Sequence, residues 1–390
     1  MISFACSCEK GRHAAPLEEA VVRRGAVEEL PRLLRDYPRL FMVCDETTYR
    51  VLGARVEAMM VAAGHTFARH ILRVPALPDE KNIGDILIHL TDPGADTDPF
   101  AFPPLPDMML AVGSGVCNDI TRLLSYRLGI PYTVCGTAPS MDGYASAGSP
   151  ILFDGTKKTI KCTTPRYIVA DLDVMREAPW NMLLAGIGDM FGKYTGILDW
   201  ELSRDCTGEY FCETIAANVL RATDACLENG YALRQRDPAT VGAIFDGFLV
   251  TGLSMTYTGN SRPASGAEHI IAHAWELFDV EAGRAPHLHG LEVCEATRIE
   301  MHLYRMLWER TEDARLRALI ARYLPAFDRV ERFTREMEMP LVTTDRETIL
   351  RGMKRALTLR DRYTVLKYLA ETGDYDRACA EACDRFLATL

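Results

Sequence analysis

The order in which strand-like and helix-like segments follow one another most constrains how this chain can fold. Over about the first 150 residues the two kinds alternate, as in the apolar run RLFMVCD and the helical stretch TYRVLGARVEAMMVAAG that follows it. Apolar runs of this kind are typical of buried parallel strands, which need a covering helix between them. After about residue 175 strand patterns nearly vanish and helical spacing dominates. We therefore expect an α/β domain with a parallel sheet, followed by an all-α domain.

Length and composition support this division and exclude some classes of function. A chain of 390 residues is long for a single core, so we expect domains at 1–175 and 176–390. The net charge of −10, without a lysine or arginine cluster, argues against a nucleic-acid binder. Apolar runs such as GAIFDGFLVTGLSM are too short or interrupted to predict a membrane span. The N-terminus lacks a signal-peptide pattern, so the twelve cysteines are expected to be reduced, in the cytoplasm.

A short glycine turn indicates a possible nucleotide site. Gly113, Ser114 and Gly115 lie between the apolar run DMMLAVG and a helical stretch. Glycines let backbone N–H groups approach a pyrophosphate at a helix N-terminus. Asp45, at the end of an earlier strand, is placed to accept hydrogen bonds from a ribose and to disfavour a 2′-phosphate, which favours NAD over NADP. The spacing is not the usual dinucleotide fingerprint, and an ordinary turn is the alternative.

A histidine cluster and one unusual aspartate predict a metal site. Four of the nine histidines fall between residues 269 and 289. His269 and His273 are four apart, so they share one face of a helix, with Glu268 directly before the first. Upstream, Asp189 lies in the apolar, glycine-rich stretch LLAGIGDMFGKYTG, where a buried carboxylate needs a partner or a metal. Lys193 shares its helical face and is either a simple ion-pair partner or a cation for an anionic substrate.

Two further stretches carry polar groups of undecided role. The loop CGTAPSMDGYASAGSP is rich in small and hydroxyl residues, and Asp142 within it is a candidate for holding a substrate hydroxyl. Near the N-terminus, Cys6, Cys8 and His13 lie close together. They supply only three ligands for a second metal, so the alternative is an exposed terminal strand without a metal.

Several motifs in order resemble one family, the sn-glycerol-1-phosphate dehydrogenases, particularly their bacterial branch. They are GSGVCNDITR, TAPSMDGYASAGSP, AGIGDMFGKYTGILDWELS, SGAEHIIAHAWEL and HLHGLEV. The similarity runs from FMVCDETTY to about residue 295, and the last 95 or so residues add little. The family belongs to the superfamily of iron-containing alcohol dehydrogenases and dehydroquinate synthases. The resemblance implies a Rossmann-like nucleotide-binding domain, a helical domain and an active site in the cleft between them.

The resemblance also implies roles for individual residues. Metal ligands would be Asp189, His269 and His289, while His287 has no match. Asp142 and His273 would contact substrate, and with Asp189 and Lys193 they form the expected catalytic group. Many relatives in the superfamily have a histidine four residues after the aspartate, and Lys193 in that position fits a three-residue metal site and a phosphorylated substrate. The expected cofactor-binding residues are Asp45, Gly113, Ser114, Gly115, Asn118, Asp119, Thr137, Ala138, Ser140 and Ser146.

The activity that the resemblance implies is metal- and NAD(P)-dependent interconversion of dihydroxyacetone phosphate and sn-glycerol 1-phosphate, in phospholipid metabolism. Zinc or nickel, with iron possible, suits one aspartate and two histidines. A homo-oligomer, dimer or larger, is expected from the relatives. Three alternatives stay open at this point: a dehydrogenase of glycerol or another polyol, a lyase like dehydroquinate synthase, and a metal- or nucleotide-binding protein without turnover.

Overall fold

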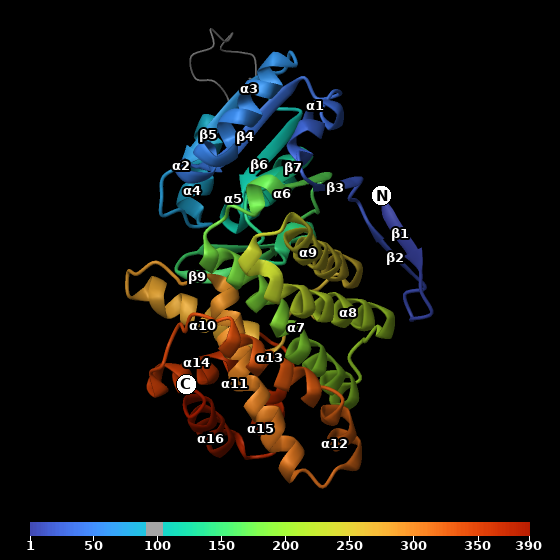
Figure 1. Ribbon diagram of the computed structural model, residues 1–390, viewed down its shortest axis with the longest axis vertical. Coiled ribbons are helices and arrows are strands. Elements are labelled where there is room, and N and C mark those ends of the chain that lie inside the picture. Colours follow the sequence, from blue (N-terminus) through green and yellow to red (C-terminus); the bar gives the residue numbers. More distant parts are fainter. Residues whose placement is uncertain (91–103) are drawn as a thin grey trace.

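Figure 1 shows the computed structural model of the protein, which describes residues 1–90 and 104–390. Within these residues, six strands form one sheet in the order β3-β10-β7-β6-β4-β5, and every neighbouring pair is parallel. Helices cover the sheet, and a helical region follows it along the chain, so the expected fold class is confirmed. The strands of the sheet are β3 (Glu19–Arg23), β4 (Arg39–Asp45), β5 (Thr66–Leu72), β6 (Met108–Gly113), β7 (Tyr132–Gly136) and β10 (Tyr167–Asp171).

The central strands follow the apolar runs of the sequence. Every residue of β6 and β7 is buried, as expected for strands that are covered on both faces. The helices of this part are α1 (Leu30–Leu33), α2 (Glu46–Thr48), α3 (Ala54–Ala62), α4 (Glu80–His89), α5 (Gly115–Leu128) and α6 (Leu172–Met175). The helix α5 ends at a glycine, because Gly129 takes the left-handed conformation with φ of 69°.

Two hairpins were not expected from the sequence. The strands β8 (Gly148–Phe153) and β9 (Thr156–Lys161) pair antiparallel beside the sheet. The strands β1 (Ile2–Ala5) and β2 (Arg12–Ala15) form a second antiparallel pair, which extends from the sheet toward α8 and α9 in Figure 1. The N-terminal segment is therefore a hairpin against the helical region and not a free terminal strand.

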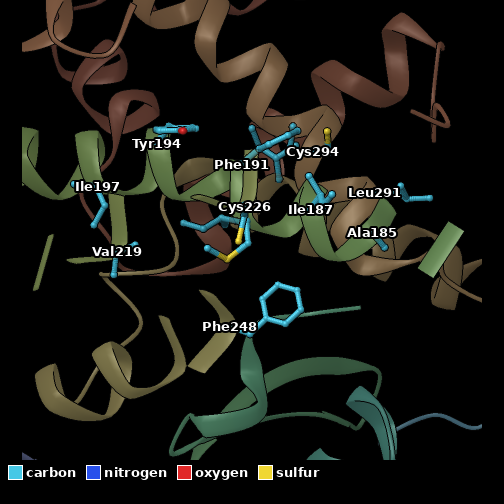
Figure 2. Packing of buried hydrophobic residues seen from close by; sticks show 14 of the residues in the cluster. Ala185, Ile187, Phe191, Tyr194, Ile197, Val219, Cys226, Phe248, Leu291 and Cys294 are labelled. Atoms are coloured by element: carbon cyan, nitrogen blue, oxygen red, sulfur yellow. The ribbon is translucent and has the colours of Figure 1, made fainter. Parts of the chain in front are cut away.

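The helical region is built around one long helix, α7 (Trp180–Thr207), whose residues from Leu183 to Ser203 are all buried. Figure 2 shows its apolar side chains packed against those of α8 (Glu213–Gly230), α9 (Pro238–Thr258) and α11 (His289–Arg310). The remaining helices are α10 (Ala267–Glu281), α12 (Ala314–Ala321), α13 (Leu324–Glu336), α14 (Arg346–Leu359), α15 (Val365–Glu371) and α16 (Tyr375–Leu387).

The helix α9 corrects one expectation. The sequence suggested that the apolar run GAIFDGFLVTGLSM is too short or interrupted to span a membrane. In the structure it is part of a continuous helix of 21 residues, which is long and apolar enough by composition to cross a bilayer. In this fold 56% of its most apolar window is buried. Because it packs beside α8 and against the short helix at Gly143–Ala145, its apolar face belongs to the protein core.

Two glycines explain how α7 comes close enough to its neighbours to form a site. A Cβ atom on Gly186 would overlap the carbonyl oxygen of Pro139, in the loop after β7. A Cβ atom on Gly290, in the first turn of α11, would overlap the carbonyl oxygen of Ala185. The glycine-rich sequence thus brings the loop after β7, the middle of α7 and the start of α11 into backbone contact.

Candidate active site and metal centre

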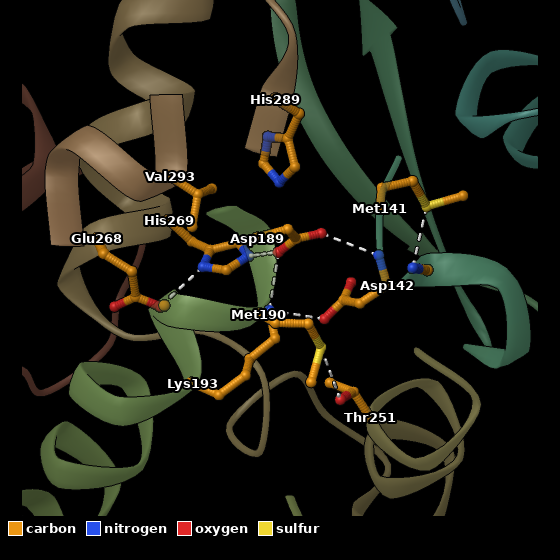
Figure 3. A network of polar contacts seen from close by, with 12 residues as sticks. Met141, Asp142, Asp189, Met190, Lys193, Thr251, Glu268, His269, His289 and Val293 are labelled. Atoms are coloured by element: carbon orange, nitrogen blue, oxygen red, sulfur yellow. Dashed lines mark hydrogen bonds and ion pairs between the residues drawn. The ribbon is translucent and has the colours of Figure 1, made fainter. Parts of the chain in front are cut away.

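Asp189, His269 and His289 form a group of three possible metal ligands. Their ligand atoms lie within 4.8 Å of one another, although they come from α7, α10 and α11. Nε2 of His269 is 3.3 Å from Oδ1 of Asp189, and the rings of His269 and His289 are 5.3 Å apart. Figure 3 shows both rings turned toward the aspartate. The three residues singled out in the sequence therefore lie together in space.

Each histidine of this group is oriented by a carboxylate on its far side. Nδ1 of His269 lies 2.7 Å from Oε1 of Glu268, and Nδ1 of His289 lies 2.8 Å from Oε1 of Glu276. A hydrogen on Nδ1 leaves the lone pair of each ring on Nε2, the nitrogen available to a metal. Two imidazoles and one carboxylate with open positions are the donor set of a catalytic zinc, nickel or iron ion. The residues present fit the divalent metal that the sequence predicts.

Lys193 lies between two carboxylates and is fully buried. Its Nζ is 2.8 Å from Oδ1 of Asp189 and 2.8 Å from Oδ2 of Asp142. The backbone N–H of Asp142 also donates to Oδ2 of Asp189, at 2.9 Å (Figure 3). Burial alone would lower the pKa of Lys193, but the two carboxylates raise it above its usual value, so the amine is charged. Burial opposes the ionisation of Asp189 as well, yet Lys193 and then His269 lower the pKa of that carboxyl.

This geometry corrects one reading of Lys193. An amine with no exposed surface and two carboxylate partners is not available to bind an anionic substrate. The ion pair with Asp189, which was the alternative reading, is the arrangement found. Lys193 instead links Asp142, from the loop after β7, to the metal-ligand candidate on α7.

His273 lies one helical turn after His269 and is also buried. Its ring stacks on that of His289, with centroids 5.3 Å apart and an interplanar angle of 17°. Its Nδ1 has no hydrogen-bond partner in the described part of the chain. Burial, followed by the positive charges of Lys157 and Arg360, lowers the pKa of His273 well below its usual value. His273 is therefore a neutral imidazole with a free polar atom beside the metal-ligand group.

The same surroundings contain two cations that sequence patterns did not reveal. Lys157, on β9, forms an ion pair with Glu276. Nη2 of Arg360, just after α14, donates to Oγ1 of Thr159 at 3.0 Å. Among the described residues no carboxylate lies within ion-pair distance of Arg360. A partly buried guanidinium without an acidic partner has capacity for an anion.

The predicted glycine turn lies between the end of a parallel strand and the start of a helix. Gly113 ends β6, Ser114 is the N-cap of α5, and no side chain caps the first turn of that helix. A Cβ atom on Gly113 would overlap the Cys117 side chain, so only glycine allows this close turn. Asp45 ends the neighbouring strand β4, where its Oδ1 accepts hydrogen bonds from the N–H groups of Thr47 and Thr48. That carboxylate is therefore partly used as a helix cap.

The other predicted cofactor residues lie in the same part of the fold, and several are tied into it. Asp119 pairs with the buried Arg122 at 2.8 Å, and burial raises the pKa of Asp119 to about 7. Asn118 accepts from the hydroxyl of Tyr132, at 3.3 Å. The remaining four are buried in or beside the loop after β7: Thr137, Ala138, Ser140 and Ser146. The structure thus brings these residues together around the α5 N-terminus and the β7 loop.

Sequence reasoning missed the residues that orient or surround the metal-ligand candidates. Glu268 and Glu276 are buried acids inside the apolar stretch AEHIIAHAWELF, and that placement is the one signal that could have identified their role. Lys157 and Arg360 lie in polar segments with no pattern of their own. His287, without a match in the family motifs, is outside the ligand group and its side chain is 54% exposed.

Comparisons with known proteins agree with this architecture. A family model described as iron-containing alcohol dehydrogenase matches residues 21–179. The solved structures of glycerol dehydrogenase from Schizosaccharomyces pombe and of iron-containing alcohol dehydrogenase from Thermococcus thioreducens both have TM-scores of 0.70 to this chain. They are 15% and 14% identical, and cover 99% and 96% of this chain and 92% and 99% of their own, which shows the shared fold.

Sequence relatives are more specific. A protein of Bacillus licheniformis named glycerol-1-phosphate dehydrogenase, NAD(P)+, is 32% identical over 385 residues. The match covers 95% of this chain and 92% of the relative. Fold, donor set and this full-length similarity point the same way: the chain belongs to the NAD(P)-dependent glycerol-1-phosphate dehydrogenase family, within the iron-containing alcohol dehydrogenase superfamily.

Proposed function

We propose that this chain interconverts dihydroxyacetone phosphate and sn-glycerol 1-phosphate with NAD(P), using one divalent metal held by Asp189, His269 and His289. The observation that carries the proposal is the convergence of two imidazoles, each oriented by a carboxylate, on a buried aspartate. The family to which the chain belongs supports the choice of substrate. Zinc, nickel and iron all suit this donor set.

The bound metal and nicotinamide supply one part of the chemistry, and the side chains of the protein supply the rest. When bound, the metal supplies Lewis acidity at the middle-carbon oxygen of the substrate, and the nicotinamide supplies or accepts hydride. His273 holds or moves the hydroxyl proton through its unpartnered Nδ1, which its neutral state permits. Lys193 keeps Asp189 ionised and fixes Asp142 beside it, where Asp142 orients the substrate. The catalytic group of this proposal is thus Asp142, Asp189, Lys193 and His273.

The phosphate of the substrate needs cations, and we assign this role to Arg360 and Lys157. Both lie near enough to His273 to depress its pKa, so an anion between them would be next to the reacting group. Within residues 1–90 and 104–390 Arg360 has no acidic partner to displace, and its fork geometry matches phosphate oxygens. Phosphate binding at this position also favours a phosphorylated substrate over free glycerol, because free glycerol has no anionic group to bind the two cations.

For the nicotinamide cofactor we propose the glycine turn and the loop after β7. The uncapped N-terminus of α5 offers N–H groups to a pyrophosphate, and its position at the end of β6 supports this use. Asp45 supports NAD over NADP through its second carboxylate oxygen, because a 2′-phosphate would be repelled there. Asn118, Asp119, Thr137, Ala138, Ser140 and Ser146 complete the proposed cofactor site.

The compartment, the domain division and the assembly of the enzyme are part of the same proposal. The twelve free cysteines support a reducing compartment, and we place the enzyme in the cytoplasm. We further propose two domains, 1–175 and 176–390, with the active site between them, and a homo-oligomer of at least two chains. Analytical ultracentrifugation of the purified protein tests the assembly.

The activity is tested with protein stripped of metal by a chelator and then given zinc, nickel or iron separately. NADH and NADPH oxidation is followed with dihydroxyacetone phosphate and, in parallel, with dihydroxyacetone. Metal-dependent turnover of the phosphorylated ketone, with sn-glycerol 1-phosphate as the product, is the expected result. Turnover of only the free ketone would instead establish a polyol dehydrogenase, and no turnover with any metal would contradict the proposal.

A further inference from the structure

A second group of side chains of the types that ligate metals lies at the N-terminal hairpin, away from the site described above. The ligand atoms of Cys6, Cys8, His13 and Cys212 lie within 4.8 Å of one another. Sγ of Cys6 is 3.6 Å from Sγ of Cys212, and Nε2 of His13 is 3.3 Å from Sγ of Cys8 and 3.6 Å from Sγ of Cys212. Cys212, which is 199 residues from His13, supplies the fourth ligand that the local sequence lacked.

These spacings match the corners of a zinc tetrahedron. Zinc binds thiolate at about 2.3 Å and imidazole at about 2.0–2.1 Å, so neighbouring ligand atoms of a tetrahedral site are roughly 3.5–3.8 Å apart. The three distances between ligand atoms are within a few tenths of an ångström of this range. A hydrogen bond from one thiol to the imidazole would explain one short separation, but the Sγ atoms of both Cys8 and Cys212 lie at such distances from the same nitrogen.

The orientation of His13 points to the same use. Its Nδ1 lies 3.4 Å from the carbonyl oxygen of Tyr257, and a carbonyl can only accept. Nδ1 therefore carries the hydrogen, and the lone pair of Nε2 faces the thiols of Cys8 and Cys212. The His13 side chain is buried, so the ring is fixed in this orientation by α9.

The backbone is shaped to present the ligands. The N–H of Cys6 donates to the carbonyl oxygen of Gly11 at 3.0 Å, and the N–H of Gly11 donates to that of Cys8 at 2.9 Å. Gly11 has a φ of 64°, in the left-handed region that favours glycine, which lets the chain reverse between Cys8 and His13. Cys212 is the N-cap residue of α8, so the start of that helix supplies the ligand that comes from outside the hairpin.

The hairpin itself needs such a link. Each of its strands has four residues, and a two-stranded hairpin of this size is at best marginally stable in water. Its contacts with the rest of the chain include the edge-on packing of Phe4 on Tyr257, with centroids 5.3 Å apart, and the cysteine–histidine group. A bound ion would therefore stabilise the docked hairpin by joining three of its side chains to the start of α8.

We propose that Cys6, Cys8, His13 and Cys212 bind one structural zinc ion, which fastens the N-terminal hairpin to the helical region. Three thiolates and one imidazole form a closed, soft ligand set typical of structural zinc, unlike the open aspartate–histidine set proposed for catalysis. The inference is independent of the proposed dehydrogenase activity. A disulfide between Cys6 and Cys212 is the competing arrangement, and it would leave Cys8 and His13 without a function.

The first test is metal content per chain, measured by mass spectrometry of the full-length protein in an Asp189→Asn background that lacks the other proposed ligand set. Zinc at about one equivalent per chain is expected there. It should fall to near zero when Cys212→Ser or Cys8→Ser is added. Cys206→Ser, an exposed cysteine at the end of α7, is the matched control and should keep the zinc. Equal zinc in the Cys212→Ser and Cys206→Ser proteins would overturn the proposal.

A second test does not depend on the variants folding. Wild-type protein grown with cobalt should show thiolate-to-cobalt charge-transfer absorption of a tetrahedral site, and its absence would contradict the proposal. Alkylation of native zinc protein should label Cys206 at once, but Cys6, Cys8 and Cys212 only after a strong chelator is added. Recovery of Cys6 and Cys212 as a disulfide from freshly purified protein would also overturn the proposal, in favour of the competing arrangement.

Discussion

Nδ1 of His269 lies 2.7 Å from Oε1 of Glu268, the residue that directly precedes it. Glu268 is fully buried and also accepts the backbone N–H of Gly266, so its position is fixed from two sides. Adjacent residues on a helix do not normally face each other, and this pair meets because the carboxylate folds back at the helix start. The glutamate before the histidine pair therefore acts through His269 and is not a general base in a zinc-protease arrangement.

This contact predicts the behaviour of Glu268→Gln. The Glu268 carboxylate fixes the His269 ring and makes it a more basic ligand. Because the substitution removes both effects, metal affinity should fall about 10- to 100-fold. Competition with a chromophoric chelator measures the affinity, and circular dichroism checks the fold. Glu276→Gln, which changes the equivalent contact to His289, should have a similar effect. Unchanged affinity in both folded variants would refute the orienting role of the carboxylates.

Asp189→Asn should separate metal binding from folding. The substitution removes a ligand charge, but Lys193 keeps Asp142 as its ionic partner, so no buried charge is left without a counterion. We expect turnover and tightly bound metal at the proposed catalytic site to be lost, with the midpoint of thermal unfolding of the chelator-treated protein within a few degrees of wild type. An Asp189→Asn enzyme with wild-type activity would end the metal assignment.

Lys193→Met, unlike Asp189→Asn, should strongly lower the stability of the metal-free fold. It leaves the Asp142 and Asp189 carboxylates buried together without their cation, which typically costs about 3–5 kcal/mol. Adding Asp142→Asn should recover part of this loss, because one of the two charges is then gone. Urea unfolding of the four proteins of this cycle, all free of metal, measures the coupling. If the two substitutions change the free energy of unfolding additively, Lys193 and Asp142 do not interact.

Arg360→Ala tests the proposed phosphate contact. A hydrogen bond to a charged group contributes about 1.5–3 kcal/mol, so kcat/KM for dihydroxyacetone phosphate should fall about 10- to 100-fold. Any residual activity on free dihydroxyacetone should stay as it is in wild type, because that substrate carries no phosphate. Arg355→Ala, an exposed arginine on α14, is the matched control. Equal losses on both ketones would place Arg360 in a structural role.

The parts of the fold that the sequence predicted are those with local patterns. The runs around β4, β6 and β7 are continuous and apolar because these strands are covered on both faces, and such runs are visible in the chain itself. The strand β9, with the sequence TKKTIK, is mostly polar and gives no such pattern. Its hairpin was therefore missed, and with it Lys157, the cation that it places near His273.

Site residues, too, could be predicted only where a local sequence pattern indicated them. Asp189 stood out because a carboxylate in an apolar helix is unusual, and the four-residue spacing of His269 and His273 put both on one face. Cys212 had no such local signal, since its partner Cys6 is 206 residues away and only the docking of the hairpin on α8 brings them together. The local sequence indicated three ligands at the N-terminus and could not identify the fourth.

His302, which lies outside the active site, should make the stability of the fold depend on pH. His302, on α11, is half-buried, and its Nε2 has no hydrogen-bond partner among the described residues. The residues Arg298, Arg305 and Arg385 lie near it. Burial first, and then these positive charges, lower the pKa of His302 to about 4 from its usual 6.5. Between these two pH values the unfolded chain binds a proton that the folded protein does not.

The stability supported by neutral His302 is therefore fully present above about pH 6.5 and is lost as the pH falls toward 4. His302→Gln should remove this part of the acid sensitivity, by about 1–2 kcal/mol once partial exposure to solvent is allowed for. Urea unfolding at a series of pH values measures the slope for wild type, for His302→Gln and for the control His89→Gln, whose side chain is half exposed. If the His302→Gln slope matches that of wild type, the unfavourable burial of a charged His302 does not limit the acid stability of this fold.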